Sequence, residues 1–460
     1  CGRPAAPVPL FLMRQKEEAP GHLSRCVSCG AAGRRRGGGY REPARSVRAV
    51  TVSDVHVLAQ DMVRQLSPRR LLVFADSRQD AAFQAGWMRD HSRRFRLRAL
   101  MWEELSRGTK TVIDLTAALD RLMEADDELS QALLPEVWTE TRKDAGFEHR
   151  ERRKFFLRVQ VLREVTTGLK QRIGLEPWGR LRVDYDGLSA AMPGLAALAS
   201  RHGLDAEALA EGIGGLLDRT RRRMILLDRD KRIFSRFWRD GDPDVLRGFV
   251  PAFQGVPTGL KLRREAGDDK NRVSAWVNDQ RNTAVLQVVR RWGVSKEHAV
   301  EVVEELWKLL AERTKLLSPV VLTGSRGNAL PGTSGTFQVD ADRLLLNPSR
   351  GLWRCSECRR AQVRRSPGDV CPSWHCHGTL AREDEPADDY DLSLLDGGVP
   401  MLRPREHSAQ VPASERERLE RLFKDETTET VNTLVATPTL EMGVDIGALD
   451  AILLRNVPPS

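Results

Sequence analysis

The sequence lacks any long apolar run. Its 460 residues contain no uninterrupted stretch near the roughly 18 residues that a membrane-spanning helix needs, and its mean hydropathy is −0.42. It also lacks the charged segment followed by an apolar one that would indicate secretion. Its seven cysteines are odd in number and are not spaced as a disulfide framework. These absences exclude the membrane and disulfide-rich secreted classes and predict a soluble, cytoplasmic protein without a membrane partner.

Lysine is scarce among the 73 basic residues, so the net charge of +9 and the isoelectric point near 9.4 come almost entirely from arginine. Arginine suits bidentate contacts with phosphate, and a basic excess favours an anionic partner such as nucleic acid. High-GC codon usage would produce the same arginine excess. Charge alone therefore does not decide the substrate.

The chain is too long for one hydrophobic core and should form two to four domains. It begins at Cys1 without a methionine and ends at Ser460, inside what we expect to be a sheet. We therefore interpret it as a piece of a longer protein.

Near the end of the sequence, two short apolar runs at 431–436 and 451–454 predict buried parallel strands. The segment between them leaves the carboxyl end of one strand, where open α/β sheets bind ligands. In it, Thr437 offers a hydroxyl, Gly443 permits close backbone approach, and Asp445 offers a carboxylate. An ordinary strand–loop–strand with turn glycines would show the same pattern.

Three segments together resemble the second RecA-like domain of superfamily 2 DEAD/DEAH-type helicases. Residues 437–447 resemble motif V, and residues 71–83, an apolar strand followed by a polar turn and a helix, resemble motif IV. Residues 405–410, followed by Glu415 and an amphipathic helix, resemble the stretch that precedes motif V. With the large insertion that separates motif IV from motif V, the chain resembles large bacterial helicases, some of them phage-defence types.

The resemblance implies a role for each matching residue. Thr437 would bind a backbone phosphate of the tracked strand, Gly443 would keep its loop tight, and Asp445 would face the ATP cleft. The strand-binding face would also include Ser77, Arg78 and Gln79, with Arg78 the best candidate for a phosphate contact. A solvated helix start is the alternative for these three residues. His407 is given no chemical role.

Several helicase elements are missing. No G-x-x-x-x-G-K-[ST] occurs, since residues 108–111 lack the loop and the first glycine. No acidic D-E-x-[DH] motif follows a strand, because the Asp-Asp-Glu-Leu run at 126–129 lies in a helical region. Motif VI would lie beyond Ser460. We therefore expect ATP and Mg²⁺ to bind only in the full-length enzyme, and this chain alone not to hydrolyse ATP. The alternative is a non-catalytic nucleic-acid-binding scaffold with a degenerate RecA fold. DNA, single-stranded or at a junction, is the expected partner, with RNA a lesser alternative.

Motifs IV and V are separated by a large insertion, which we expect to project as one or more subdomains and which offers a surface for a protein partner. The fold class predicted is α/β, a partial RecA-like parallel sheet interrupted by a mainly helical insertion. A helix–helix–hairpin order at 283–348 resembles a winged helix, although an irregular helical insert would also fit. The predicted segments are 1–48, 49–95 (first part of the RecA-like domain), 96–282 (helical), 283–348, 349–384 (zinc knuckle) and 385–460 (second part of the RecA-like domain).

Two short cysteine hairpins lie in the 349–384 segment. Four thiolates at such spacing can close a tetrahedral zinc site of structural type, because each pair sits on a tight turn. The second pair has four intervening residues rather than two, so His375 or His377 could replace one sulfur. The predicted ligands are Cys355, Cys358, Cys371 and Cys376.

A further pair, Cys26 and Cys29, is a weaker signal. It predicts half of a second zinc site, completed by Cys1, His22 or residues upstream of the chain. Two ordinary surface thiols are the alternative.

Overall fold

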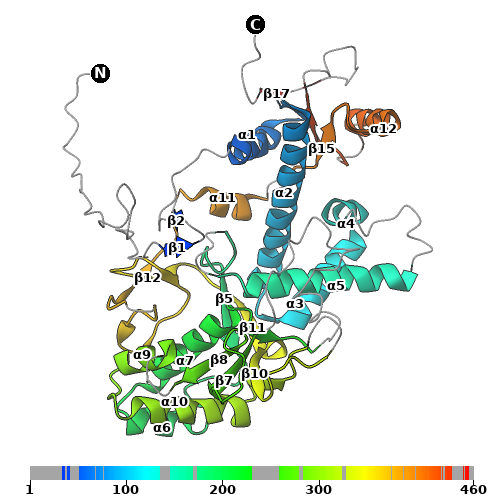
Figure 1. The fold of residues 1–460 in the computed structure, drawn as a ribbon. Coiled ribbons are helices and arrows are strands. Elements are labelled where there is room, and N and C mark those ends of the chain that lie inside the picture. The colour runs from blue at the N-terminus through cyan, green and yellow to red at the C-terminus, as the bar shows by residue number, and fades with distance from the viewer. Residues whose placement is uncertain are drawn as a thin grey trace, which may run out of the picture.

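Figure 1 shows the computed structural model, in which one long helix leads from a small parallel sheet into a larger body. The structure describes residues 34–36, 39–41, 51–67, 69–75, 77–134, 146–168, 173–229, 258–278, 283–323, 328–373, 376–386, 388–398, 400–425, 427, 430–437, 449 and 451–454.

The smaller part of the molecule is built on a four-stranded parallel sheet. Its strands are β3 (Leu71–Phe74), β15 (Pro404–His407), β16 (Thr433–Ala436) and β17 (Ala451–Leu454). They pair in the order β15-β16-β3-β17. In this register Phe74 lies opposite both Ala436 and Leu454, so the carboxyl ends of β16, β3 and β17 share one edge. The apolar runs predict three of these strands. The fourth, β15, is short and mostly polar and gave no such signal.

Helices cover both faces of this sheet, as the alternation of side chains along β3 requires. On one face, Leu71 and Val73 pack with α1 (Thr51–Gln65) and α2 (Arg78–Ser106). On the other face, Leu72 packs with α12 (Ala413–Lys424). Further members of the two clusters are Val55, Ala59, Val63, Met88 and Val435 on the first face, and Leu419, Phe423 and Leu434 on the second.

Helix α2 joins the sheet to the larger body. It begins where predicted, because the Ser77 side chain caps it by accepting a hydrogen bond from the Asp80 N–H at 3.1 Å. It continues well past the predicted end near Asp90. The boundary predicted at 95/96 therefore falls inside one helix. The reason is that Leu97, Leu105 and their neighbours continue an apolar surface that packs into the core of the larger body.

Two histidines lie between α1 and α2. The ring of His91 stacks on Trp87 with centroids 3.6 Å apart, and the ring of His56 meets Trp87 edge-on at 5.4 Å. Burial, with a smaller effect from His91, lowers the pKa of His56 to about 4. Burial, together with the charges of Arg94 and Arg98, lowers the pKa of His91 to about 4. Both rings are therefore neutral at pH 7.

This pair predicts a loss of stability in mild acid. An unfolded histidine has a pKa of about 6.5, so between there and about pH 4 the unfolded chain binds more protons than the folded one. The free energy of unfolding should fall as the pH decreases from 7 towards 4. Replacing both His56 and His91 by glutamine should flatten that fall, measured by urea unfolding at each pH. An unchanged pH slope in the double variant would contradict this assignment.

The larger body contains two further sheets, so the segment predicted as helical at 96–282 is less helical than expected. An antiparallel sheet in the order β4-β11-β5 is made of β4 (Lys110–Thr111), β5 (Leu181–Tyr185) and β11 (Leu344–Pro348). The second sheet, in the order β6-β10-β7-β8 with β9 paired to β10, is made of β6 (Leu226–Leu227), β7 (Gly259–Arg263), β8 (Val273–Val277), β9 (Leu317–Val320) and β10 (Thr336–Asp340). The strands of both sheets are short and several include charged residues, so they do not form the long apolar runs that mark a buried strand in a sequence.

Helices pack around these sheets, and several begin at polar caps. Thr111 and Asp114 form a reciprocal capping box at the start of α3, and Asp126 caps α4. The Asp-Asp-Glu-Leu run at 126–129 thus lies at a helix start, in a helical region as expected. The helices are α3 (Val112–Ala125), α4 (Asp127–Leu133), α5 (Gly146–Val165), α6 (Leu195–Arg201), α7 (Ala206–Arg221), α9 (Ala284–Arg291), α10 (Ala299–Lys308), a π-helical turn (Leu309–Arg313), 3-10 turns (Ala341–Arg343 and Pro367–Asp369) and α11 (Tyr390–Gly397).

The predicted order of helix, helix and hairpin is observed in α9, α10, β9 and β10. The hairpin does not stand alone, since β10 also pairs with β6 and β7. The strand predicted at Leu344 belongs to the other sheet, where β11 pairs with β4 and β5. A winged helix therefore stays a prediction.

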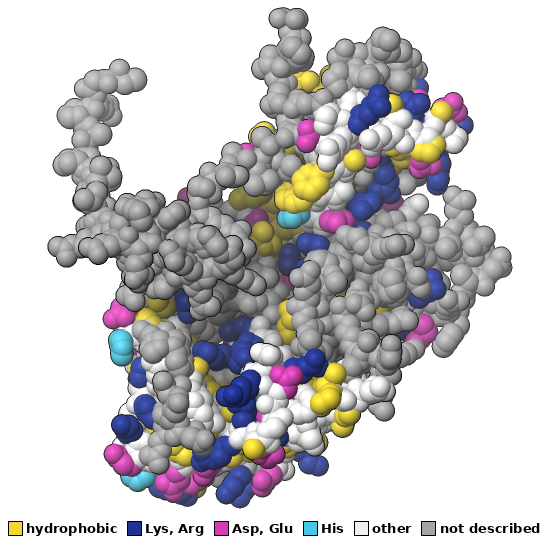
Figure 2. All heavy atoms as spheres, in the orientation of Figure 1, with side chains coloured by type: hydrophobic (Ala, Val, Ile, Leu, Met, Phe, Trp, Pro, Cys, Tyr) yellow, Lys and Arg dark blue, Asp and Glu magenta, His cyan; other side chains and the backbone are white. Residues whose placement is uncertain are grey.

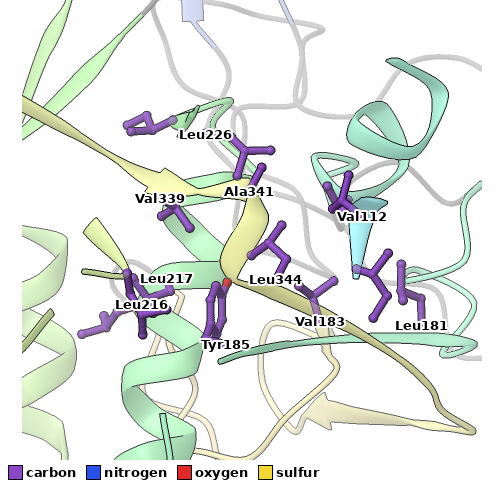
Figure 3. Close-up of a cluster of buried hydrophobic side chains, with 14 of the residues drawn as sticks. Val112, Leu181, Val183, Tyr185, Leu216, Leu217, Leu226, Val339, Ala341 and Leu344 are labelled. Carbon is purple, nitrogen blue, oxygen red and sulfur yellow. The ribbon is translucent and has the colours of Figure 1, made fainter. Parts of the chain in front are cut away.

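One hydrophobic core unites the larger body, and Figure 3 shows part of it. Its members come from α3, β5, α7, β6, β10 and β11, which are far apart in sequence. The part of the insertion that contributes to this core is therefore one packed body, whereas the cysteine-bearing segment has a small apolar cluster of its own. The side chains labelled are Val112, Leu181, Val183, Tyr185, Leu216, Leu217, Leu226, Val339, Ala341 and Leu344. No helix in the described part of the chain is both long and apolar enough to cross a membrane. Near the N-terminus, β1 (Arg34–Arg36) and β2 (Gly39–Arg41) pair antiparallel.

Candidate functional site

The four predicted cysteines converge on a small antiparallel sheet, β13-β12-β14. Its strands are β12 (Leu352–Cys355), β13 (Ala361–Gln362) and β14 (Leu380–Glu383). Cys355 ends β12 and Cys358 lies on the turn that follows, where Arg359 takes a left-handed conformation at φ 55°. Cys371 and Cys376 lie before β14. Two local turns thus bring both pairs together.

The geometry of the four sulfurs fits a tetrahedral zinc ion. All four lie within 4.8 Å of one another, with 3.5 Å between the sulfurs of Cys355 and Cys376 and 3.7 Å between those of Cys358 and Cys371. Zinc–sulfur bonds of about 2.3 Å place tetrahedral sulfurs about 3.8 Å apart. None of the four is in a disulfide, and all but Cys358 are fully buried. The cluster could hold one zinc ion.

The surroundings of the sulfurs also fit a metal. A Cβ atom at Gly378 would lie 2.5 Å from the sulfur of Cys355, so only glycine leaves room for the cluster. Burial raises the pKa of the Cys371 thiol, and raises that of Cys376 to about 11. Thiols in such surroundings ionise at neutral pH only when a cation compensates the charge.

A carboxylate that the sequence did not single out lies beside the cluster. Oε2 of Glu357 lies 3.7 Å from the sulfur of Cys376 and accepts a hydrogen bond from the His377 N–H at 3.2 Å. The His377 side chain is exposed and outside the group of four sulfurs, whereas His375 lies outside the described residues. The geometry therefore favours four sulfur ligands over a histidine replacement. The Cys26 and Cys29 pair also lies outside the described residues.

The cysteine-bearing sheet is attached to the larger body by two arginines. Arg364, fully buried, donates to Asp218 Oδ2 at 2.9 Å and to Asp184 Oδ1 at 3.1 Å. Arg291 on α9 donates to the backbone carbonyls of Ser373, at 3.2 Å, and of Cys376. The candidate metal centre is therefore continuous with the fold of the insertion.

Asp218 is the centre of a buried charge network. Burial alone would raise its pKa, but Arg364, Arg221 and Arg222 hold the pKa of this carboxyl well below its usual range. Its Oδ1 accepts hydrogen bonds from the Tyr185 hydroxyl at 2.8 Å and from Arg221 at 3.0 Å. Arg221 and Arg222 lie one helical turn from Asp218, but Tyr185 and Arg364 are far from it in sequence, so no local pattern could have indicated these two partners.

At the other candidate site, the strands that precede Arg78 and Thr437 lie side by side. The Ala75 N–H donates to the Ala436 carbonyl at 2.8 Å, so the two segments leave the sheet at the same edge. Ser77, Arg78 and Gln79 are all exposed there.

The individual residues at this edge differ in what they could contact. Ser77 serves its own helix, since its hydroxyl donates to the Asp80 side chain at 3.0 Å besides accepting the cap hydrogen bond. Arg78 makes no ion pair with any residue that the structure describes. Thr437 is only 3% exposed, so its side chain does not reach the surface. Of the four predicted strand-binding residues, Arg78 and Gln79 are therefore the two whose side chains face solvent and do not cap a helix.

The remaining predicted residues separate into two groups. His407 is buried, with Nε2 2.8 Å from Glu420 Oε1, and so links β15 to α12. Gly443 and Asp445, predicted at the ATP cleft, lie outside the described residues.

Comparisons of the chain with protein-family models, curated proteins and solved structures give no match.

Proposed function

We propose that the chain is the second motor domain of an ATP-dependent DNA helicase or translocase, and that a nucleic acid strand binds at the carboxyl edge of β3 and β16. One observation carries the proposal. The segments that resemble motifs IV and V leave neighbouring parallel strands at the same edge, although residues 75–432 lie between β3 and β16. A motor of this class needs these two segments side by side.

The chemistry of the edge suits a phosphate. Arg78 and Gln79 occupy the first turn of the 29-residue helix α2, whose unpaired N–H groups and dipole favour an anion. The Arg78 guanidinium can donate two parallel hydrogen bonds to one phosphate. These contacts read the backbone and not the base, as a translocating motor requires.

The other parts of a motor would come from the full-length protein. The sequence supplies neither the phosphate-binding lysine loop nor the acidic pair that holds Mg²⁺, so ATP and Mg²⁺ would bind across a cleft shared with a first RecA-like domain. Zinc at the four cysteines would have a structural role. All four positions of a tetrahedral site would be filled by sulfur, leaving none for a substrate.

Removing the exposed arginine tests the proposal. Arg78→Gln should weaken binding of a fluorescein-labelled oligo(dT) about three- to tenfold, and should make the salt dependence shallower by roughly 0.7 in log–log slope, the value of one lost phosphate contact. Fluorescence anisotropy at several salt concentrations measures both.

The matched control is Arg121→Gln, which removes the same charge from an exposed site on α3. It should leave affinity and slope unchanged. Equal effects of the two substitutions would show that only net charge matters and would contradict a phosphate contact at Arg78.

A further inference from the structure

A basic pocket lies in the larger body, apart from both candidate sites. Its volume is about 270 Å³, and it is bounded by the C-terminal end of α7, strands β7 and β8, and the first turn of α9. Buried Leu260 and Trp276 contribute apolar lining. None of the described residues that line it is acidic, whereas four are basic: Arg219, Arg223, Arg264 and Lys270. Figure 2 shows Lys and Arg side chains gathered on the part of the molecule where Figure 1 labels α7, β7 and β8.

The acidic residues of the adjoining loop are already paired. In the loop between β7 and β8, Asp268 binds Lys261 at 2.9 Å, and Asp269 binds Arg272 at 3.0 Å. Glu265 also binds Lys261, at 3.2 Å. The loop's two remaining cations, Arg264 and Lys270, have side chains that make no hydrogen bond or ion pair with other described residues.

The two arginines contributed by α7 are held at the pocket. Arg223 donates a hydrogen bond to the Ser274 hydroxyl of β8 at 2.9 Å. Arg219 is partly buried and makes no ion pair with a described residue. Burial, then the charges of Arg223 and Arg360, lower the pKa of Arg219. An anion in the pocket would stabilise the charged guanidinium of Arg219 and so offset this lowering of its pKa.

A helix dipole does not account for the cluster. Arginines near the C-terminal end of α7 compensate its exposed carbonyls. Arg264 and Lys270 belong to a loop, however, and cannot serve that purpose. Arg360, whose charge acts on Arg219, comes from the cysteine-bearing segment just after Cys358. Cations from two separate parts of the chain, α7 and the β7–β8 loop, thus line one hollow, whereas Arg360 lies outside its lining.

We propose that this pocket binds the phosphate backbone of a nucleic acid strand, as a second contact region besides the carboxyl edge of β3 and β16. The choice of nucleic acid rests on the proposed function. The phosphate chemistry rests on the cluster itself, because three arginines and a lysine that form no ion pair with a described residue line a hollow in which no described lining residue is acidic, and such a site selects an anion. Four cations line the hollow, more than a single phosphate needs, which favours a polyanion.

The test uses the whole chain and a fluorescein-labelled oligo(dT). R264Q/K270Q changes two exposed loop residues whose side chains make no hydrogen bond or ion pair with another described residue, although the charge of Arg264 acts on Asp268. It should weaken binding about five- to twentyfold and make the salt slope shallower by roughly 1.4, the value of two lost phosphate contacts on a single strand. Arg219→Gln should weaken binding further when added. Thermal unfolding of each variant shows that the fold is retained.

The control is R121Q/K154Q, which removes one arginine and one lysine from exposed positions on α3 and α5. It should bind as the wild type does. If the wild type and Arg78→Gln differ but R264Q/K270Q binds like the wild type, the pocket proposal fails while the proposed function stands. If the wild type does not bind oligo(dT), both fail. Inorganic pyrophosphate that competes as strongly per phosphate as oligo(dT) would overturn the polyanion assignment.

Discussion

Cys371→Ser is expected to remove one zinc ion per chain and to unfold the segment around β12, β13 and β14. The sulfur of Cys371 is buried and lies 3.7 Å from that of Cys358, so a serine would break the tetrahedral set. Structural zinc contributes on the order of 10 kcal/mol to the folding of small domains. This segment has only a small apolar cluster of its own, built around the cysteines and Leu380. Metal content by mass spectrometry and thermal unfolding measure the two effects.

Loss of the metal should also affect the larger body, because Arg364 and Arg291 attach the segment to it. The melting temperature of the whole chain should therefore fall, rather than a local signal alone. Ser356→Ala is a suitable control, since it changes the turn between Cys355 and Cys358 and removes the hydroxyl that accepts a hydrogen bond from the Thr379 N–H at 3.1 Å, without touching a sulfur. It should keep the full zinc content. Wild-type zinc content in Cys371→Ser would contradict the assignment of the four ligands.

The second large effect is expected from Arg364→Gln. Asp218 would lose one buried guanidinium partner, and half-buried Asp184 would keep only Arg182 as its charged partner. Removing one partner of a buried ion pair costs about 3–5 kcal/mol of unfolding free energy, and we expect the lower end because Arg221 and Arg222 remain beside Asp218. The Arg364 side chain is closely packed, since a Cβ at Gly214 would lie 2.6 Å from its guanidinium. Urea unfolding, followed by tryptophan fluorescence, measures the loss.

The neighbouring residue provides the matched control. Arg365 carries the same charge in an exposed ion pair with Asp369. Arg365→Gln should cause no measurable change in the urea midpoint, because exposed pairs contribute little. Similar midpoints for the two variants would show that the buried network does not stabilise the fold.

The parallel sheet was largely predictable because its signals are local. Short apolar runs mark β3, β16 and β17, and a serine followed three residues later by aspartate marks the start of α2. The four cysteines were predictable for the same reason, since each pair is closed by its own turn. Spacing alone was sufficient for both features.

Features that depend on tertiary contacts were not predictable. β5 reads Leu-Arg-Val-Asp-Tyr, an alternation that is itself a strand signal, but nothing local indicates that it pairs with the distant strand β11. Arg364 is one of several arginines in its segment, and nothing local distinguishes it from exposed Arg365. The basic pocket likewise joins residues that individually resemble ordinary surface charges. The burial of Thr437 could not be seen either, since it depends on how β16 packs within the sheet.

The central claim is that a nucleic acid strand contacts the carboxyl edge of the parallel sheet, at the start of α2. The most direct measurement is photo-crosslinking to oligo(dT) of a chain in which exposed Gln79 is replaced by p-benzoylphenylalanine, compared with the same replacement at exposed Ile113 on α3. If the strand binds at the start of α2, position 79 should give a strong crosslink that unlabelled oligo(dT) competes away, and position 113 should give little. Equal crosslinking from the two positions, or none from position 79 while the chain still binds oligo(dT), would contradict it.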